Sequence, residues 1–231
     1  MSEPGSRRGR THDAEGARQT ILDAAEEVFA EHGFDGARVD AIAEVAGYNK
    51  SLIFQYFGDK LGLYEAVIRR ADDQTRVWQN EALSTFSEVE PSMNTDQIKN
   101  LLGKYVGLYF DYLVKHPRIM RIYMWEMAEG WQTFSKIVSQ RDFDDVDQFA
   151  PVLAKLQSAG LLRSNLNPLL QLSPALFVSA LYLALLPLYK VLIPDLDVYS
   201  SDELAQAREF IIEFTVNGLL ITSAEAKPRK R

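Results

Sequence analysis

The sequence predicts an all-α protein in which an N-terminal three-helix, helix-turn-helix domain is joined to a C-terminal helical domain. Three observations support this fold class. Apolar residues recur at helical spacing along nearly every segment of the 231 residues. Neither a convincing strand pattern nor an internal repeat interrupts them. Near the N-terminus, Ala43, Gly47 and Ile53 stand at the offsets that a helix-turn-helix requires.

Four helices are expected in the N-terminal part. The first carries an apolar stripe that ends at Gly33, and the second is a short helix closed by Gly47. Asn49 is placed to cap the third helix, and Asp59 a long fourth one. The run 88–95 contains proline and asparagine and indicates a loop.

A second set of helices follows this loop. An apolar stripe over 98–112 ends at His116-Pro117, because the residue before a proline avoids the helical region. A helix rich in Met and aromatic residues is expected over 118–127, and another over 146–157. A long apolar helix should begin at Pro168 and end before Pro194, and the last helix should cover 202–222.

Composition excludes several classes of protein. The chain has no cysteine, so disulfides, thiolate metal sites and thiol nucleophiles are ruled out. The N-terminus lacks the apolar core of a secretory signal, and we expect a cytoplasmic protein. The apolar run 169–186 imitates a membrane span, but it contains Gln171, and we favour a buried or interface helix. A membrane span is the alternative.

The net charge of −7 argues by itself against binding to nucleic acid, so only the distribution of charge can support it. Arginines crowd residues 1–17, which we expect to form a flexible basic arm that follows the DNA backbone or minor groove. Residues 224–231 form a basic tail.

The helix-turn-helix is expected within residues 18–64. Ala43 is small where two helices cross, and Gly47 tolerates positive φ in the turn. Ile53 locks the third helix of the chain onto the second. The third helix, called the recognition helix, would lie in the major groove of DNA. The alternative is a helical adaptor for protein partners, which we disfavour because Lys50, Leu52 and Gln55 would be exposed together without a packing role.

Residues 19–67 resemble the DNA-binding domain of the tetracycline-repressor (TetR-like) family without a gap. The matching residues are Ala24-Ala25, Phe29, Gly33-Phe34, Ile42-Ala43, Ala46-Gly47 and the run from Lys50 to Lys60. The resemblance implies a homodimer that binds double-stranded DNA. It also implies that residues 65–223 form a divergent helical domain for ligand binding and dimerisation.

The resemblance also assigns roles on the recognition helix. Lys50 matches a basic residue near the start of this helix, and Lys60 matches a lysine that pairs with phosphate. Tyr56 matches a phosphate donor and keeps its hydroxyl, whereas Phe54 stands where a tyrosine is usual and offers only packing. Gln55 would point toward the DNA, where its amide could pair with adenine.

Three residues depart from the family pattern. Ser51 replaces the usual glycine, and Leu52 replaces threonine and could touch a thymine methyl. Arg38 replaces Ser or Thr, so the helix loses a cap but gains a charge that can pair with phosphate. These departures concern the operator sequence rather than the function.

Met and aromatic residues of the C-terminal part are candidates for an apolar ligand pocket, a use to which these adaptable side chains are suited. Taken singly each residue is more simply core, and the set is proposed mainly because the family has a pocket there. Glu126 could face a cationic ligand, but we favour a solvated or helix-paired acid. The ligand candidates are Tyr105, Tyr109, Tyr112, Met120, Tyr123, Met124, Trp125, Met127, Trp131 and Phe177.

The last two helices are candidates for a dimer interface made of four helices, two from each copy. Packing within one copy only is the alternative. The candidate interface residues are Leu181, Ala184, Leu188, Ala207, Ile211, Phe214 and Gly218.

We find no pattern that indicates an enzyme, a metal site or a cofactor. The three histidines are scattered, and the acidic run 142–147 is best explained as a solvated helix start. The Gly103/Gly107 pair is weak evidence of any role.

We therefore expect a transcriptional repressor that binds a palindromic operator as a dimer and is released by a small, largely apolar ligand. The alternatives are the same fold acting as an activator or answering to a protein partner, and a helical adaptor without a DNA role.

Overall fold

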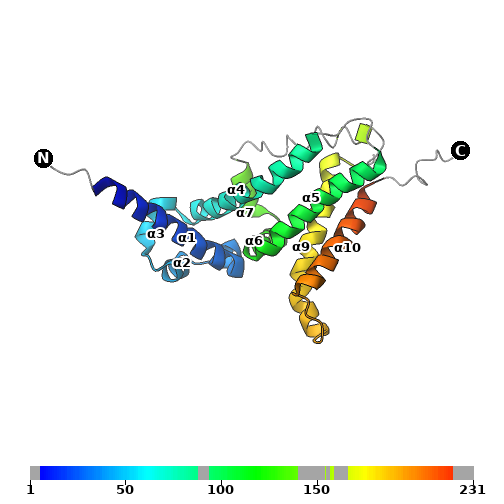
Figure 1. The fold of residues 1–231 in the computed structure, drawn as a ribbon. Helices are drawn as coiled ribbons and strands as arrows, with labels where there is room; N and C mark the ends of the chain where they lie inside the picture. Colours follow the sequence, from blue (N-terminus) through cyan, green and yellow to red (C-terminus); the bar gives the residue numbers. More distant parts are fainter. Residues whose placement is uncertain (1–5, 88–93, 140–153, 155–156, 159–165, 221–231) are drawn as a thin grey trace, which may run out of the picture. The chain divides into compact units, whose positions relative to one another are not determined.

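The computed structural model describes residues 6–87, 94–139, 154, 157–158 and 166–220 (Figure 1). It confirms the predicted all-α fold class. Three predicted features lie outside the described residues. They are the acidic run 142–147, the basic tail and the predicted helix at 146–157, of which only residues 154 and 157 are described. The helices are α1 (Ser6–Gly36), α2 (Val39–Ala46), α3 (Lys50–Phe57), α4 (Lys60–Ser87), α5 (Thr95–Lys115), α6 (Pro117–Ala128), α7 (Gln132–Val138), α9 (Pro168–Leu192) and α10 (Ser201–Leu219).

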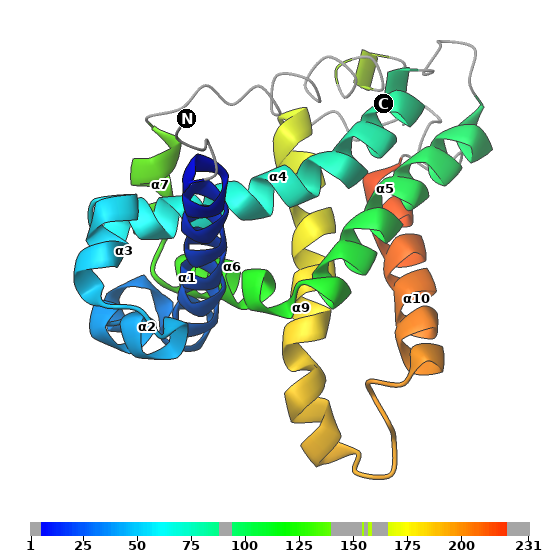
Figure 2. The same ribbon diagram turned by 60° about the vertical axis from the view of Figure 1, so that its left-hand side comes forward.

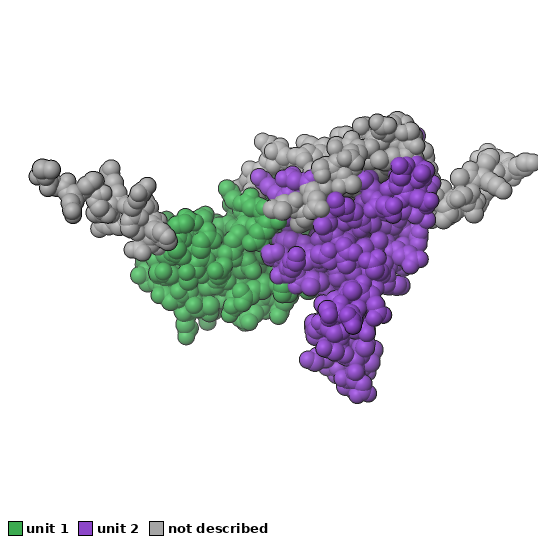
Figure 3. All heavy atoms as spheres, in the orientation of Figure 1, with its two compact units in different colours: residues 1–74, 117–141 green, residues 75–116, 142–231 purple. Residues whose placement is uncertain are grey.

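The chain forms two compact units, coloured separately in Figure 3. Unit 1 comprises Met1–Gln74 and Pro117–Arg141, and unit 2 comprises Thr75–His116 and Asp142–Arg231. The sequence placed a boundary between residues 64 and 65. The structure differs, because the first part of α4 and the later helices α6 and α7 pack into the same core as the N-terminal helices.

Unit 1 has one apolar core built from both segments of the chain. Phe29 of α1, Ile42 of α2 and Ile53 of α3 are all fully buried in it. Ile119 and Ile122 of α6 are buried in the same cluster, which is why α6 belongs to this unit. Phe29 also packs edge-on against the ring of Tyr64. The segment rich in Met and aromatic residues therefore supports the N-terminal helices.

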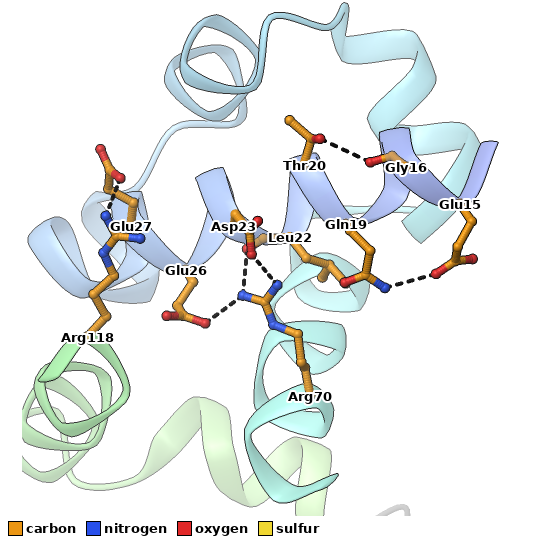
Figure 4. Close-up of polar contacts among 10 residues, drawn as sticks. All are labelled: Glu15, Gly16, Gln19, Thr20, Leu22, Asp23, Glu26, Glu27, Arg70 and Arg118. Carbon is orange, nitrogen blue, oxygen red and sulfur yellow. Dashed lines mark hydrogen bonds and ion pairs between the residues drawn. The ribbon is translucent and has the colours of Figure 1, made fainter. Parts of the chain in front are cut away.

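Polar contacts link α1 to α4 and to α6 (Figure 4). The Arg70 guanidinium of α4 donates to Asp23 and to Glu26, each at 2.5 Å. Arg118 of α6 donates to Glu27 at 2.5 Å. Three acids of α1 thus bind arginines of α4 and α6.

The first helix begins earlier than the sequence predicted. Residues 6–17, which we expected to form part of a flexible arm, continue α1 toward the N-terminus. Apart from two glycines this stretch consists of residues that a helix tolerates, and its only nearby proline is Pro4, which precedes the helix. At the other end, Gly33 has φ of 67°, and this departure from helical geometry kinks α1 where the sequence predicted its end.

Unit 2 is built around α5, α9 and α10, which pack against one another (Figure 2). A Cβ atom on Gly103 would lie 3.1 Å from Ile212 Cγ2, and one on Gly107 would lie 2.4 Å from Arg208 Nη2. The two glycines therefore let α10 approach α5 closely. Arg208 donates two hydrogen bonds to the carboxylate of Asp111, at 2.9 and 3.1 Å, directly beside this crossing.

The long apolar helix is α9, and it begins at Pro168 as predicted. One side of it, including Ser179, Ala180 and Leu183, is buried in unit 2. The other side exposes Leu181 and Leu188. Among the helices over the described residues, none has the length and apolar character needed to cross a membrane.

Candidate nucleic-acid interface

The turn between α2 and α3 has the geometry that the spacing of Ala43, Gly47 and Ile53 predicted. Gly47 adopts φ 71° and ψ 21°, a left-handed conformation that favours glycine. The Tyr48 backbone N–H donates to Ala43 O at 3.1 Å. Asn49 Oδ1 accepts from the Leu52 N–H at 2.8 Å and so caps α3. With Ile53 at 0% exposure, α3 is fixed at its start and along its inner face.

The outer face of α3 carries most of the predicted DNA-contacting side chains. Lys50, Ser51, Phe54 and Gln55 are exposed. Leu52 differs from expectation, because it is half-buried and packs against the core of unit 1. It therefore has a packing role, and the part of its side chain open to a thymine methyl is smaller than the sequence implied.

Lys50 has a partner within the protein. Its Nζ lies 3.0 Å from Asp40 Oδ2 in the first turn of α2. The same nitrogen stands 5.8 Å from the centre of the Phe54 ring. A carboxylate therefore compensates the cation at the start of the recognition helix, and a phosphate would have to compete with it. No motif or spacing in the sequence singles out Asp40.

Lys60 is also engaged, at the start of α4. Its Nζ donates to Asp35 O at 3.2 Å and lies 4.6 Å from the centre of the Phe34 ring. The side chain is half-buried, so it anchors the segment that leads into α2. Arg38 stands at the cap position of α2, makes no side-chain cap hydrogen bond and is exposed.

The turn from α3 into α4 is tight. Gly58 has φ of 80°, and the Gly62 N–H donates to Asp59 Oδ1 at 2.8 Å, which is the cap predicted for this helix. A Cβ atom on Gly62 would lie 2.1 Å from Phe57 O, so only glycine fits there. This turn fixes the C-terminal end of α3, where Tyr56 is half-buried beside Phe57.

Glu126 connects α4 to α6 and α7 inside unit 1. It is buried, so the expectation of a solvated or helix-paired acid is wrong. Glu126 Oε1 accepts from the Tyr64 hydroxyl at 2.7 Å, and Oε2 accepts from the Phe134 backbone N–H at 3.0 Å. Burial and, next to it, the hydrogen bond to Glu126 raise the pKa of the Tyr64 phenol far above its ordinary value. Both carboxyl oxygens are thus occupied within the protein, and neither faces a ligand.

The ten residues predicted to line one pocket are divided between the two units. Tyr105, Tyr109, Tyr112 and Phe177 belong to unit 2. Burial raises the pKa of Tyr109 to about 12. The remaining six belong to unit 1, which packs around the N-terminal helices; they are Met120, Tyr123, Met124, Trp125, Met127 and Trp131.

Trp125 shows how one member of the second group packs on α1. Its indole Nε1 donates to Ala30 O at 3.2 Å, and its ring lies 3.1 Å from where a Cβ on Gly33 would stand. The aromatic and Met pattern of the sequence reflects this packing for part of its length. A ligand role for any of the ten residues stays a prediction.

The predicted dimer residues also separate into two groups. Ala207 and Ile211 of α10 are buried within their own unit, because this end of the helix crosses α5 closely. Phe214 is 58% exposed, and Gly218, Leu181 and Leu188 are exposed as well. Ala184 is half-buried. An interface between copies can therefore use the second group but not Ala207 and Ile211.

Comparison with known proteins gives matches over both parts of the chain. The profile of the family described as bacterial regulatory proteins, tetR family, matches residues 21–67. The profile described as Tetracyclin repressor-like, C-terminal domain, matches residues 102–215.

Individual proteins agree with these profiles. The HTH-type transcriptional repressor NicS of Pseudomonas putida is 27% identical over 161 residues, which are 68% of this chain and 71% of NicS. The HTH-type transcriptional repressor SCO4008 of Streptomyces coelicolor is 32% identical over 51% of this chain, and the match spans only 53% of that repressor. A crystal structure of a TetR family regulator from Marinobacter aquaeolei has a TM-score of 0.63 at 19% identity, covering 92% of this chain and all of that one, and so shares its fold.

Proposed function

Because this chain belongs to the TetR family of bacterial regulatory proteins and is a DNA-binding transcriptional regulator, we propose that it is a repressor that binds a palindromic operator as a homodimer. A small, largely apolar ligand releases it by favouring an arrangement in which the two recognition helices no longer match successive major grooves. Like the DNA that it binds, the protein acts in the cytoplasm.

The observation that carries this proposal is the presentation of α3. The cap from Asn49 and the buried Ile53 hold this helix rigidly, while Gln55 is exposed on its outer face. A rigid support of this kind favours base readout, because a bidentate amide–adenine pair depends on exact placement. Gln55 reads a base, and Leu52 contributes the exposed part of its side chain.

Phosphate contacts position the helix without reading sequence. Lys50, Tyr56 and Lys60 carry this role, together with Arg38 at the start of α2. Ser51 and Phe54 complete the surface that meets the DNA. Lys50 exchanges Asp40 for a phosphate when DNA is bound.

The dimer follows from how few base pairs one recognition helix can read. Two copies related by a two-fold axis double the site and place the half-sites about 34 Å, or a multiple of that distance, apart. The exposed side chains of α9 and α10, Leu181, Leu188 and Phe214, support an interface between copies. Phe214 also stacks on Phe210, with ring centres 6.1 Å apart, which gives α10 a continuous aromatic surface.

Selection of binding sites from random DNA tests the proposal. The wild-type protein should return an inverted repeat, and Gln55→Ala should relax one base position in each half-site at a cost of about 1–3 kcal/mol on the preferred site. Gln206→Ala, at an exposed position of α10, is the matched control and should return the wild-type repeat. An unchanged consensus for Gln55→Ala would remove Gln55 from base readout. Failure of the wild-type protein to enrich any sequence would overturn the proposal.

A further inference from the structure

A cavity of about 730 Å³ lies between α9 and α10, and the described residues that line it all belong to unit 2. The two helices run antiparallel (Figure 1), so the cavity joins the first half of α9 to the second half of α10. Its apolar lining includes Val178, Phe210 and Leu219. This volume falls within the range of about 300–1,000 Å³ that is typical of small-molecule sites. None of the ten residues that the sequence suggested for ligand binding is among the described residues that line it.

Two polar side chains of this lining lack partners in the described structure. Gln171 is 6% exposed, and neither its amide nitrogen nor its amide oxygen has a hydrogen-bond partner. Thr215 is equally buried, and its hydroxyl has no partner either. Buried polar atoms in native proteins are almost always paired. The unpaired atoms themselves have almost no accessible surface, so a molecule in the cavity pairs with them only after the side chains that cover them shift.

The unpaired atoms define the chemistry of that molecule. Gln171 offers one donor group and one acceptor, and Thr215 adds a hydroxyl that serves as either. A carboxamide satisfies all of them, because its oxygen accepts and its N–H groups donate. A carboxylate only accepts, so it would leave Gln171 Oε1 unpaired. It would also meet Glu213, and the described lining residues include no lysine or arginine to offset that charge.

We propose that the α9–α10 cavity is a binding site for an uncharged molecule with an apolar body and a carboxamide-type donor–acceptor end, held by Gln171 and Thr215. That this molecule is the effector rests on the proposed function, whereas its binding does not. Phe214 lines the cavity and is also an exposed residue of the proposed interface between copies. A molecule seated here therefore acts directly on the helices that set the distance between the two recognition helices.

Displacement of a neutral fluorescent probe, N-phenyl-1-naphthylamine, from the full-length protein tests the site. Octanamide should displace the probe at a concentration at least tenfold lower than octanoate. Gln171→Leu and Thr215→Val, which keep shape and remove polar atoms, should abolish this preference. Ser179→Ala is the control, because Ser179 is buried on the same helix with an unpaired hydroxyl but is not among the described residues lining the cavity. It should keep the wild-type preference.

Three results would overturn the proposal. They are the absence of displacement by octanamide, equal displacement by octanoate, and a preference for the amide that survives both cavity substitutions. If octanamide fails and Gln171→Leu instead changes the dissociation constant of the dimer, a second copy fills the cavity. DNA binding is measured separately by fluorescence anisotropy. If octanamide binds as expected but leaves the DNA complex intact, the site stands and the proposed release by ligand fails.

Discussion

Removal of the Tyr64 hydroxyl should destabilise unit 1 by about 2 kcal/mol. The hydroxyl donates to Glu126 Oε1 at 2.7 Å, and both side chains are about 1% exposed, so water cannot replace the lost donor. Hydrogen bonds to charged groups contribute roughly 1.5–3 kcal/mol, and a buried acceptor left unpaired bears its full desolvation cost. Tyr64→Phe changes almost no volume, so the loss of the hydrogen bond dominates.

Urea unfolding followed by circular dichroism measures this loss. With a dependence on urea of about 2–3 kcal/mol per molar, the midpoint should fall by roughly 0.7–1 M. Tyr56→Phe is the matched control, because Tyr56 has no hydrogen bond in the described structure; it should leave the midpoint unchanged and weaken DNA binding instead. A Tyr64→Phe midpoint equal to that of the wild type would refute the role given to Glu126.

Other substitutions and conditions test separate parts of the structure. Asp40→Asn should strengthen DNA binding in an anisotropy titration, because Lys50 then reaches its phosphate without leaving a carboxylate; weaker binding would contradict this. Phe214→Glu should give monomers in analytical ultracentrifugation, because two like charges would meet at the two-fold axis, whereas Gln206→Glu should stay dimeric. The unfolding free energy should fall as the pH rises above 10, because the buried tyrosines stay neutral in the fold but ionise when the chain unfolds. The slope per tyrosine is about 1.4 kcal/mol per pH unit, and a flat profile up to pH 12 would contradict the raised pKa values of Tyr64, Tyr105 and Tyr109.

Local features of the fold were predictable because they depend on neighbouring residues. Gly47 requires positive φ in the turn, Asn49 caps α3 and Asp59 caps α4, and each of these follows from residue type and position alone. The helix-turn-helix was therefore correctly located. The start of α1 was not, because nothing between Ser6 and the first apolar residues strongly opposes or enforces a helix.

Packing between distant segments was not predictable. Ile119 and Ile122 have the same apolar spacing whether α6 joins the N-terminal core or the C-terminal one, and the pattern does not name the partner. The same holds for Ala207 and Ile211, which an ideal helix places on one face with Phe214. Gln171 was visible in the sequence as a polar residue within an apolar run, but only the structure shows that its amide is unpaired at a cavity wall.

The crossing of α5 and α10 restricts how this protein can be recombined with its relatives. Since a methyl group on Gly107 would collide with Arg208, and Arg208 is held by Asp111, a change at one of these three positions affects the other two. A chimaera that takes α10 from a relative while keeping α5 would pack a different side chain against Gly107 in place of Arg208. Exchange of effector domains between such regulators should therefore transfer both helices together.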